Sequence, residues 1–108
     1  MTVKNLAESE FFTPVILSEP EREISGVYIG DLLSWVMGRA ESGDAWITIM
    51  SNLNILAVAS LADTSCIILA EGVTLEQEVI ETAKQKNINI ISTTSSIYDT
   101  AVILSQIL

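Results

Sequence analysis

The sequence contains no histidine and a single cysteine, Cys66, and these absences exclude several kinds of site. Histidine is the commonest general base and metal ligand, so Ser-His-Asp and Cys-His catalytic arrangements cannot form within this chain. One cysteine cannot form an internal disulfide, which suits a reducing compartment. Because Cys66 lies in an apolar run, we predict a buried, unreactive thiol. We therefore expect a cytoplasmic protein that is not an enzyme.

Basic residues are also scarce: 5 stand against 14 acidic residues, which gives a formal net charge of −9. An acidic surface repels the phosphates of nucleic acids and anionic lipids, so neither nucleic acid nor membrane is an expected partner. The longest apolar run, 55–62, is far shorter than the roughly 20 residues that span a bilayer. The alternating Glu19, Glu21 and Glu23 follow no cation-binding loop pattern, so we predict a solvated acidic face and no metal site.

The N-terminus, 1–4, has no apolar run of the kind that a signal peptide carries. The 108 residues, of which 49% are hydrophobic, predict one domain over 1–108. Apolar periodicity and turn residues predict strands at 11–17, 24–29, 45–50, 66–70 and 88–91, and helices at 3–10, 31–40, 55–62, 75–86 and 97–108. This alternation is typical of an α/β domain with a mostly parallel or mixed sheet covered by helices.

Five local signals refine this prediction. Pro14 indicates an edge or irregular position in its strand, and Gly26 indicates a bulge or a close backbone approach. Asp31 is expected to cap the helix that follows it, with Leu32, Leu33, Val36, Met37 and Ala40 on one apolar face. Thr74 and Gln77 have the spacing of a capping box. Asn87 can close its helix in a left-handed conformation.

Two blocks of sequence carry a resemblance to a known family. They are Gly26–Met37, and Gly43–Ile49 followed by Asn54–Ala62. In this order and at this spacing they resemble the DRTGG domain family over nearly the whole chain. The signature segment corresponds here to Glu21-Arg22 and Ser25-Gly26-Val27, so Arg22 and Gly26 keep the family residue. Gly30 and Asp31 are further motif positions in the first block.

The resemblance implies an α/β fold similar to the N-terminal domain of HPr kinase/phosphorylase, and a regulatory role. Such domains also occur in phosphate acetyltransferases and in pyrophosphatases that carry CBS domains. It implies no catalytic residues, and the chain has no Gly-x-x-x-x-Gly-Lys-Ser/Thr loop to hold a nucleotide's phosphates. Val27 stands where the family has a second glycine, and it removes the backbone freedom that glycine would supply.

Polar links follow three of the predicted strands. They contain Ser51, Asn52 and Asn54; Glu71 and Gly72; and Ser92, Thr93, Thr94 and Ser95. Ligands of open parallel sheets bind outside the carboxyl ends of the strands, so these residues are candidates for a small-molecule site. The first and last links precede helices, whose free backbone donors suit an anion or polar ligand. The same side chains could equally serve in helix capping and turns alone.

The final helix has more apolar surface than one core requires. Beyond the stripe of Ile97, Ala101, Leu104 and Leu108, it carries Val102, Ile103 and Ile107. Helix 55–62 is apolar almost all round, which is typical of a helix buried on several sides. Either the core wraps both helices, or Val102, Ile103 and Ile107 form the surface of a homodimer, for which two-fold symmetry is the usual geometry.

Three functions remain as hypotheses. The first is a homodimeric, non-catalytic regulatory or ligand-sensing module that binds a small polar ligand or a protein partner. The second is a structural or assembly subunit of a larger redox or signalling complex, which the apolar final helix favours. The third is an enzyme that uses Ser or Asp groups with a borrowed cofactor, and the polar strand ends are its support. No cofactor is identified from the sequence.

Overall fold

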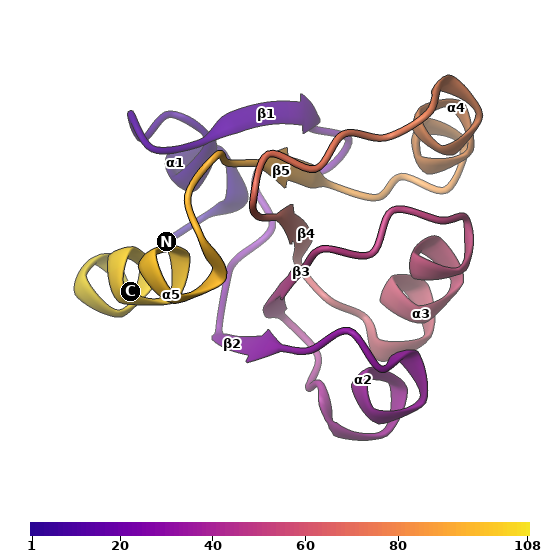
Figure 1. Cartoon of the computed structure of the whole chain (residues 1–108), viewed down its shortest axis with the longest axis horizontal. Helices are drawn as coiled ribbons and strands as arrows, with labels where there is room; N and C mark the ends of the chain where they lie inside the picture. The colour runs from indigo at the N-terminus through magenta and orange to yellow at the C-terminus, as the bar shows by residue number, and fades with distance from the viewer.

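The computed structural model describes all 108 residues, which form one five-stranded sheet with five helices. In chain order the elements are α1 (Val3–Ala7), β1 (Thr13–Ile16), β2 (Gly26–Ile29), α2 (Leu33–Arg39), β3 (Asp44–Thr48), α3 (Asn54–Ala62), β4 (Cys66–Leu69), α4 (Gln77–Gln85), β5 (Ile90–Ser92) and α5 (Ile97–Ile107). The strand order is β1-β5-β4-β3-β2. The strands β2 to β5 are parallel and β1 is antiparallel to β5 (Figure 1). The predicted α/β class with a mixed sheet is therefore confirmed.

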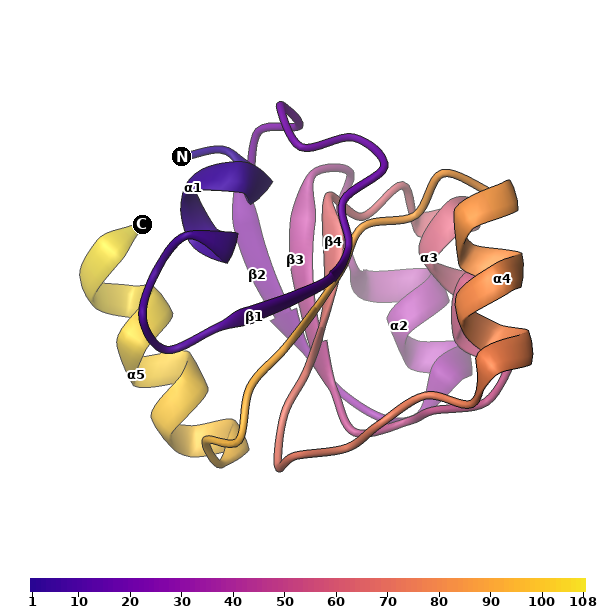
Figure 2. The ribbon, with the colours of Figure 1, turned by 90° about the horizontal axis from the view of Figure 1, so that it is seen from above.

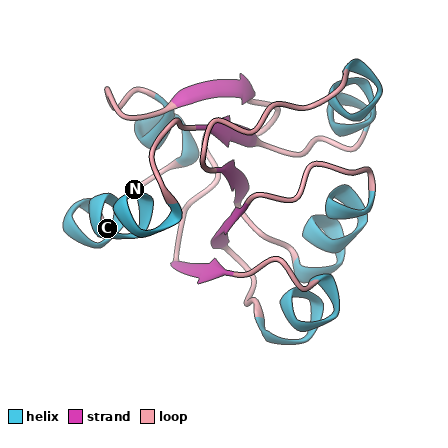
Figure 3. Ribbon diagram, viewed as in Figure 1, coloured by secondary structure: helices cyan, strands magenta, loops and turns pink.

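The helices cover the sheet on both faces. Figure 2 shows α2, α3 and α4 on one side, and α1 and α5 on the other. Side chains alternate along each strand, so β3 sends Trp46 to the first side and Ile47 to the second. All four residues of β4 are buried, as expected of a central parallel strand. Helices lie outside and strands inside, as Figure 3 shows by secondary structure.

Several local predictions are confirmed. Pro14 lies in the edge strand β1, where the pairing register with β5 shifts between Pro14 and Ile16. A proline has no N–H to donate, so this irregular edge position accommodates it. Asn87 adopts a left-handed φ of 57° just after α4. The thiol of Cys66 is buried, with 1% of the residue exposed.

Both predicted caps are wrong. The helix α2 begins two residues after Asp31, and Asp31 Oδ1 instead accepts hydrogen bonds from Thr48 Oγ1 (2.7 Å) and the Ile49 N–H (3.1 Å). Asp31 therefore links the end of β2 to the end of β3. The helix α4 begins at Gln77, which donates its side chain to Glu81 (2.6 Å) rather than capping the helix.

Two predicted helix faces also differ from the structure. In α2, Val36 is buried, but Leu32 and Met37 are 59% and 46% exposed. In α3, four residues are buried while Leu61 is 71% exposed, so this helix is covered on one side and not on several. Local hydrophobicity overstated burial here because nothing in the chain packs against the outer faces of α2 and α3. No helix of the chain combines the length and the apolar character that crossing a membrane requires.

Candidate functional site

A groove of about 520 Å³ opens at the carboxyl ends of the parallel strands. We call it the carboxyl-end groove; it lies where α3 and α4 begin. Its lining residues are Ser51, Asn52, Leu53, Thr74, Leu75, Glu76, Glu78 and Val79. Of the candidate ligand residues, Ser51 and Asn52 line it. Those outside it are Asn54, Glu71, Gly72, Ser92, Thr93, Thr94 and Ser95.

Asn52 has a local structural role as well as a place in the groove. Its Oδ1 accepts a hydrogen bond from the N–H of Asn54 (2.9 Å), and its carbonyl accepts from the N–H of Ile55 (3.3 Å). These bonds form a turn that starts α3. The Asn52 side-chain amide donors, however, make no hydrogen bond within the chain, and neither do the Ser51 and Thr74 hydroxyls. The groove therefore offers unused hydrogen-bonding groups.

The first turn of α4 adds backbone donors to this groove. No side chain caps the helix, and the first N–H with a helical partner is that of Val79, which donates to the Glu76 carbonyl (3.0 Å). The N–H groups of Gln77 and Glu78 have no acceptor in the chain. The Glu76 and Glu78 carboxylates line the same groove. This combination suits a polar ligand with acceptor oxygens and disfavours a highly charged phosphate.

The other candidate loops, which follow β4 and β5, lie together and form hydrogen bonds with each other. The Glu71 N–H donates to the Ser95 carbonyl (2.8 Å) and the Gly72 N–H to the Thr93 carbonyl (3.0 Å). Thr93 is 5% exposed; its Oγ1 donates to the Phe11 carbonyl (2.9 Å) and accepts from the Ser95 N–H (3.1 Å). This side chain thus ties the loop after β5 to the segment before β1. In this cluster the observed hydrogen bonds hold the loops to each other and to the segment before β1.

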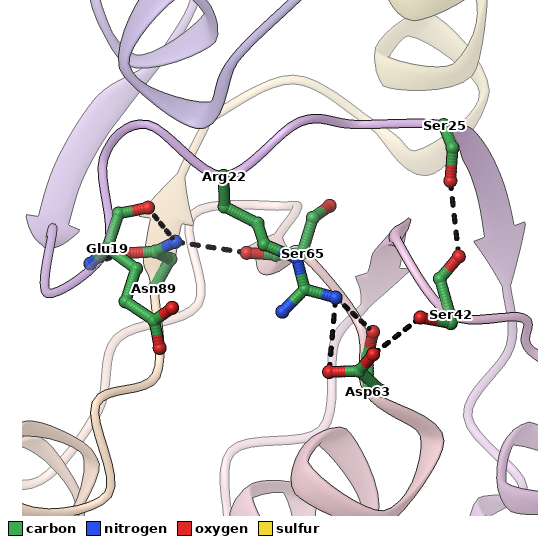
Figure 4. A network of polar contacts seen from close by, with 7 residues as sticks. All are labelled: Glu19, Arg22, Ser25, Ser42, Asp63, Ser65 and Asn89. Carbon is green, nitrogen blue, oxygen red and sulfur yellow. Dashed lines mark hydrogen bonds and ion pairs between the residues drawn. The ribbon is translucent and has the colours of Figure 1, made fainter.

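The signature segment forms a strap, residues 18–25, across the amino-terminal ends of β4 and β5. Figure 4 shows Arg22 reaching from the strap to Asp63 at the end of α3. Arg22 Nη2 donates to the Asp63 carbonyl (2.8 Å) and lies 3.1 Å from its Oδ1. Ser42 Oγ donates to the other carboxylate oxygen. These bonds from Ser42 and Arg22 lower the pKa of the Asp63 carboxyl.

The end of the strap is held by close packing against the turn before β3. Ser25 Oγ donates to the Ser42 carbonyl (3.2 Å). A Cβ at Gly26 would lie 2.6 Å from Asp44 Oδ1, so the predicted close approach at Gly26 is confirmed. The Asp44 carboxylate accepts from the Glu41 N–H through its other oxygen (2.8 Å). A glycine is therefore required at the point of β2 where this buried carboxylate lies against the backbone.

Gly30, a further motif position, accepts a hydrogen bond through its carbonyl. The indole Nε1 of Trp46 donates to it at 2.9 Å, which satisfies the one polar atom of a fully buried side chain. The sequence did not identify the partners of the motif, namely Ser42, Asp63 and Asn89. Asp63 had one signal that could have been used, because an acid directly after an apolar helix can occupy a left-handed C-terminal position (φ 57°).

Asn89 fastens the other end of the strap. Its Nδ2 donates to the carbonyls of Glu19 (2.8 Å) and Ser65 (3.0 Å), and its Oδ1 accepts from the Glu19 N–H (2.8 Å). Asn89 is 3% exposed, so these bonds are shielded from water. The strap is therefore attached to three different parts of the fold (Figure 4). Glu19 is bonded to Asn89, Arg22 to Asp63, and Ser25 to Ser42.

The remaining titratable groups give no catalytic or metal-binding arrangement. Burial raises the pKa of the Cys66 thiol to about 12, which keeps it protonated. No three or more acidic or cysteine side chains gather where they could hold a metal ion.

Comparison with known proteins gives one family and one similar fold. The family model described as the DRTGG domain matches residues 16–107. No curated protein matches the sequence. A similar solved structure is the CBS and DRTGG domains of the regulatory region of Clostridium perfringens pyrophosphatase, complexed with its activator, diadenosine tetraphosphate. The TM-score is 0.75 at 21% identity, over 97% of this chain and 46% of that chain, which establishes a shared fold over about half of the larger protein.

Proposed function

This chain belongs to the DRTGG domain family, and from that premise we propose that it is a non-catalytic, homodimeric regulatory module that binds a small polar ligand. The whole of 1–108 acts as the regulatory unit, and a buried, reduced cysteine fits a cytoplasmic location. The similar fold in a pyrophosphatase belongs to a regulatory region that is complexed with an activator. That relationship supports a sensing role and leaves the ligand of this chain to be determined from its own groove.

The observation that carries the ligand-binding part is the carboxyl-end groove. Its free groups are the hydroxyls of Ser51 and Thr74, the amide of Asn52 and the unpaired N–H groups that begin α4. These groups converge outside the carboxyl ends of parallel strands, the usual ligand position in an open α/β sheet. The hydroxyls and the amide orient the ligand, while the Glu76 and Glu78 carboxylates select against multiple phosphates.

Amide-resolved NMR titration of the full chain tests this assignment. The ligands are adenosine, a nucleoside monophosphate and diadenosine tetraphosphate, together with a panel of neutral polar metabolites. Binding is expected to shift the amides of 51–53 and 76–79. Thr74→Val removes a hydroxyl without changing side-chain shape, and it should weaken binding about tenfold if that bond is made. Thr94→Val is the matched control, because Thr94 is exposed and lies outside the groove.

Two outcomes would refute the groove as the site. One is the absence of amide shifts with every compound in the panel. The other is an equal effect of Thr74→Val and Thr94→Val, because the groove hydroxyl would then have no specific role.

The homodimer part rests on apolar side chains that the chain leaves uncovered. Val27 and Ile29 on β2 are 38% and 45% exposed. They pair in register with Ala45 and Ile47, which belong to the core beneath α5, so all four residues share one sheet face. Because β2 is an edge strand, its outer backbone groups are also unpaired.

The helix α5 continues this apolar face. Ile107 is 39% exposed, and Val102 and Ile103 are half-buried. Ile103 packs against the core of its own chain, so Val102 and Ile107 are the better candidates for contact with a partner. A two-fold axis beside α5 and β2 would place this face of one chain against the same face of its partner.

Sedimentation equilibrium tests the homodimer. We expect the wild-type chain to be dimeric, and Ile29→Glu or Ile107→Glu to shift it toward monomer because a charge cannot be buried cheaply at an apolar contact. Leu61→Glu is the control, since Leu61 is also apolar and exposed (71%) but lies on α3, across the sheet. A wild-type chain that stays monomeric at all concentrations contradicts the proposal.

A second candidate function is assembly with a different protein. It is favoured by exposed side chains at α2. Leu32, just before the helix, and Trp35 within it are 59% and 52% exposed, and Arg39 is stacked 3.8 Å from the centre of the Trp35 ring. An exposed Trp–Arg pair is typical of residues that dominate binding at protein interfaces. Ligand retention separates the two functions: a sensing module responds to compounds in the titration, whereas an assembly subunit does not and loses partner binding on Trp35→Ala.

A further inference from the structure

A second hollow lies at the opposite end of the sheet from the carboxyl-end groove. Its volume is about 190 Å³, and it is enclosed by the strap, the ends of α3 and α4, and the start of β5. We call it the strap hollow. The charged side chains in its lining are Glu19, Arg22, Asp63 and Lys86. Residues from three separate parts of the sequence therefore meet around one small space.

The hollow gathers positive charge that is rare in this protein. Two of the five basic residues, Arg22 and Lys86, line it. Arg22 uses Nη2 for Asp63, which leaves its Nε and Nη1 donors without a partner in the chain. The Lys86 ammonium forms no ion pair. These donor groups can bind an oxyanion, although the net charge of −9 on the chain otherwise repels anions.

The same hollow also attracts positive charge. The Glu19 carboxylate makes no ion pair or side-chain hydrogen bond. The helices α3 and α4 both end here, and helix carboxyl termini carry partial negative charge from their last carbonyls. The lining therefore offers Glu19 to an ammonium group, and Arg22 and Lys86 to an oxyanion.

Two residues of the lining have hydroxyls without partners. Thr64 Oγ1 and Ser65 Oγ are both buried and make no hydrogen bond in the chain. Buried hydroxyls without partners are uncommon, since each costs about 1–3 kcal/mol in lost hydration. These hydroxyls are unused hydrogen-bonding groups next to the hollow.

We propose that the strap hollow binds a small zwitterion of the size of a free α-amino acid. Its carboxylate binds the free donors of Arg22 and Lys86, and its ammonium binds the carboxylate of Glu19. The two cationic and two anionic side chains of the lining balance, so a ligand carrying one charge of each sign enters without leaving an unpaired charge. A volume of about 190 Å³ accommodates one such molecule and excludes a dinucleotide.

This site is distinct from the proposed function, because it uses none of the residues of the carboxyl-end groove. Its ligand joins the strap to α3 and α4. Binding should therefore resist the separation of the strap from the helices, and so raise the melting temperature as the concentration of free ligand increases.

The test is a thermal-shift and calorimetric titration of the full chain with the free α-amino acids. We expect at least one to bind saturably and to raise the melting temperature. Glu19→Gln and Lys86→Gln should each weaken that binding by about tenfold or more. Both side chains are otherwise unbonded, so these variants should fold normally. Lys84→Gln is the matched control on the same helix, and it should bind as the wild type does.

Derivatives of the ligand separate the charge requirements. The N-acetylated and the carboxamide forms each lack one charge, and each should bind about tenfold or more weakly than the parent. Thr74→Val should leave amino-acid binding unchanged, so failure of the groove and failure of the hollow are distinguishable. The proposal is overturned if no free amino acid binds at millimolar concentration, if acetate or phosphate binds as tightly, or if Lys86→Gln and Lys84→Gln behave alike.

Discussion

Arg22 holds the end of a helix that lies 41 positions further along the chain: its Nη2 donates to the carbonyl of Asp63 (2.8 Å) and pairs with the carboxylate (3.1 Å). Asp63 is the residue that closes α3 in a left-handed conformation. One guanidinium thus binds both the carbonyl of Asp63, which also accepts from the Gly43 N–H (2.9 Å), and the carboxylate of the same residue. The arginine of the family signature therefore acts in this structure as a latch between the strap and α3.

The latch predicts a specific acid sensitivity. Because Ser42 and Arg22 lower the pKa of Asp63 from its ordinary 3.8, the ionised carboxylate stabilises the folded chain above that value, and this contribution is lost as the pH falls through the lower folded pKa. Asp63→Asn should therefore reduce stability at neutral pH and have a smaller effect in acid. Urea unfolding of both chains across the acidic range measures the difference, which would stay constant with pH if the pair contributed nothing.

Gly26 is predicted to tolerate no side chain. Gly26→Ala places a Cβ 2.6 Å from Asp44 Oδ1, and relieving that overlap should cost about 1–3 kcal/mol of unfolding free energy. The control is Gly38→Ala, because a Cβ on that α2 residue meets nothing within 4 Å. Gly38→Ala should instead stabilise the chain by up to about 1 kcal/mol. Chemical denaturation of both variants decides the matter, and equal effects would contradict the packing argument.

Cys66 is predicted to react only when the chain opens. The thiol is buried within β4, and its pKa of about 12 keeps it protonated at neutral pH. A disulfide reagent at mildly alkaline pH should therefore label the native chain slowly and the urea-unfolded chain at the rate of a free thiol. Rapid labelling without denaturant would show that β4 is accessible in solution, contrary to the structure.

The fold was largely predictable because its signals are local and strong. The apolar run that contains Cys66 indicated a strand at 66–70 and a buried thiol, and the alternation of strands and helices indicated a mostly parallel or mixed sheet. Pro14 and Gly26 were also interpreted correctly, since each reflects a restriction on the residue's own backbone. The two capping errors have different causes. Asp31 prefers a tertiary partner, the distant Thr48 hydroxyl. Thr74 lies too early to cap, because α4 begins only at Gln77 with Glu76 at the cap position.

The candidate site was predictable only in part. The carboxyl-end position came from a rule about parallel sheets, and Ser51 and Asn52 do line a groove there. The contribution of Thr74, Glu76 and Glu78 depends on how α4 is placed beside α3, which no sequence spacing specifies. The strap hollow was missed for the same reason, because Glu19, Arg22 and Lys86 are separated by up to 67 positions and are brought together by the crossover of the sheet.

Asn89 provides the most direct test of the strap. Asn89→Ala removes the three hydrogen bonds that join Asn89 to Glu19 and Ser65, and it should destabilise the chain by about 1–3 kcal/mol. Asn89→Asp has nearly the same shape, but it replaces a donor to two carbonyls with an oxygen. At neutral pH this buried carboxylate faces two carbonyl oxygens, so we expect Asn89→Asp to be at least as destabilising as Asn89→Ala.

The aspartate variant should also recover in acid, which a mere loss of packing would not do. Burial and the two carbonyls raise the pKa of the introduced carboxyl, since the protonated form alone can donate to the carbonyl of Glu19 or Ser65. A raised folded pKa means that the penalty is small below the unfolded value of about 3.9 and grows as the pH rises above it. Urea unfolding near pH 4 and pH 7 should therefore show Asn89→Asp approaching the wild type in acid, while the deficit of Asn89→Ala stays nearly constant. A pH-independent deficit in both variants would show that Asn89 fills space and does not fasten the strap through its amide.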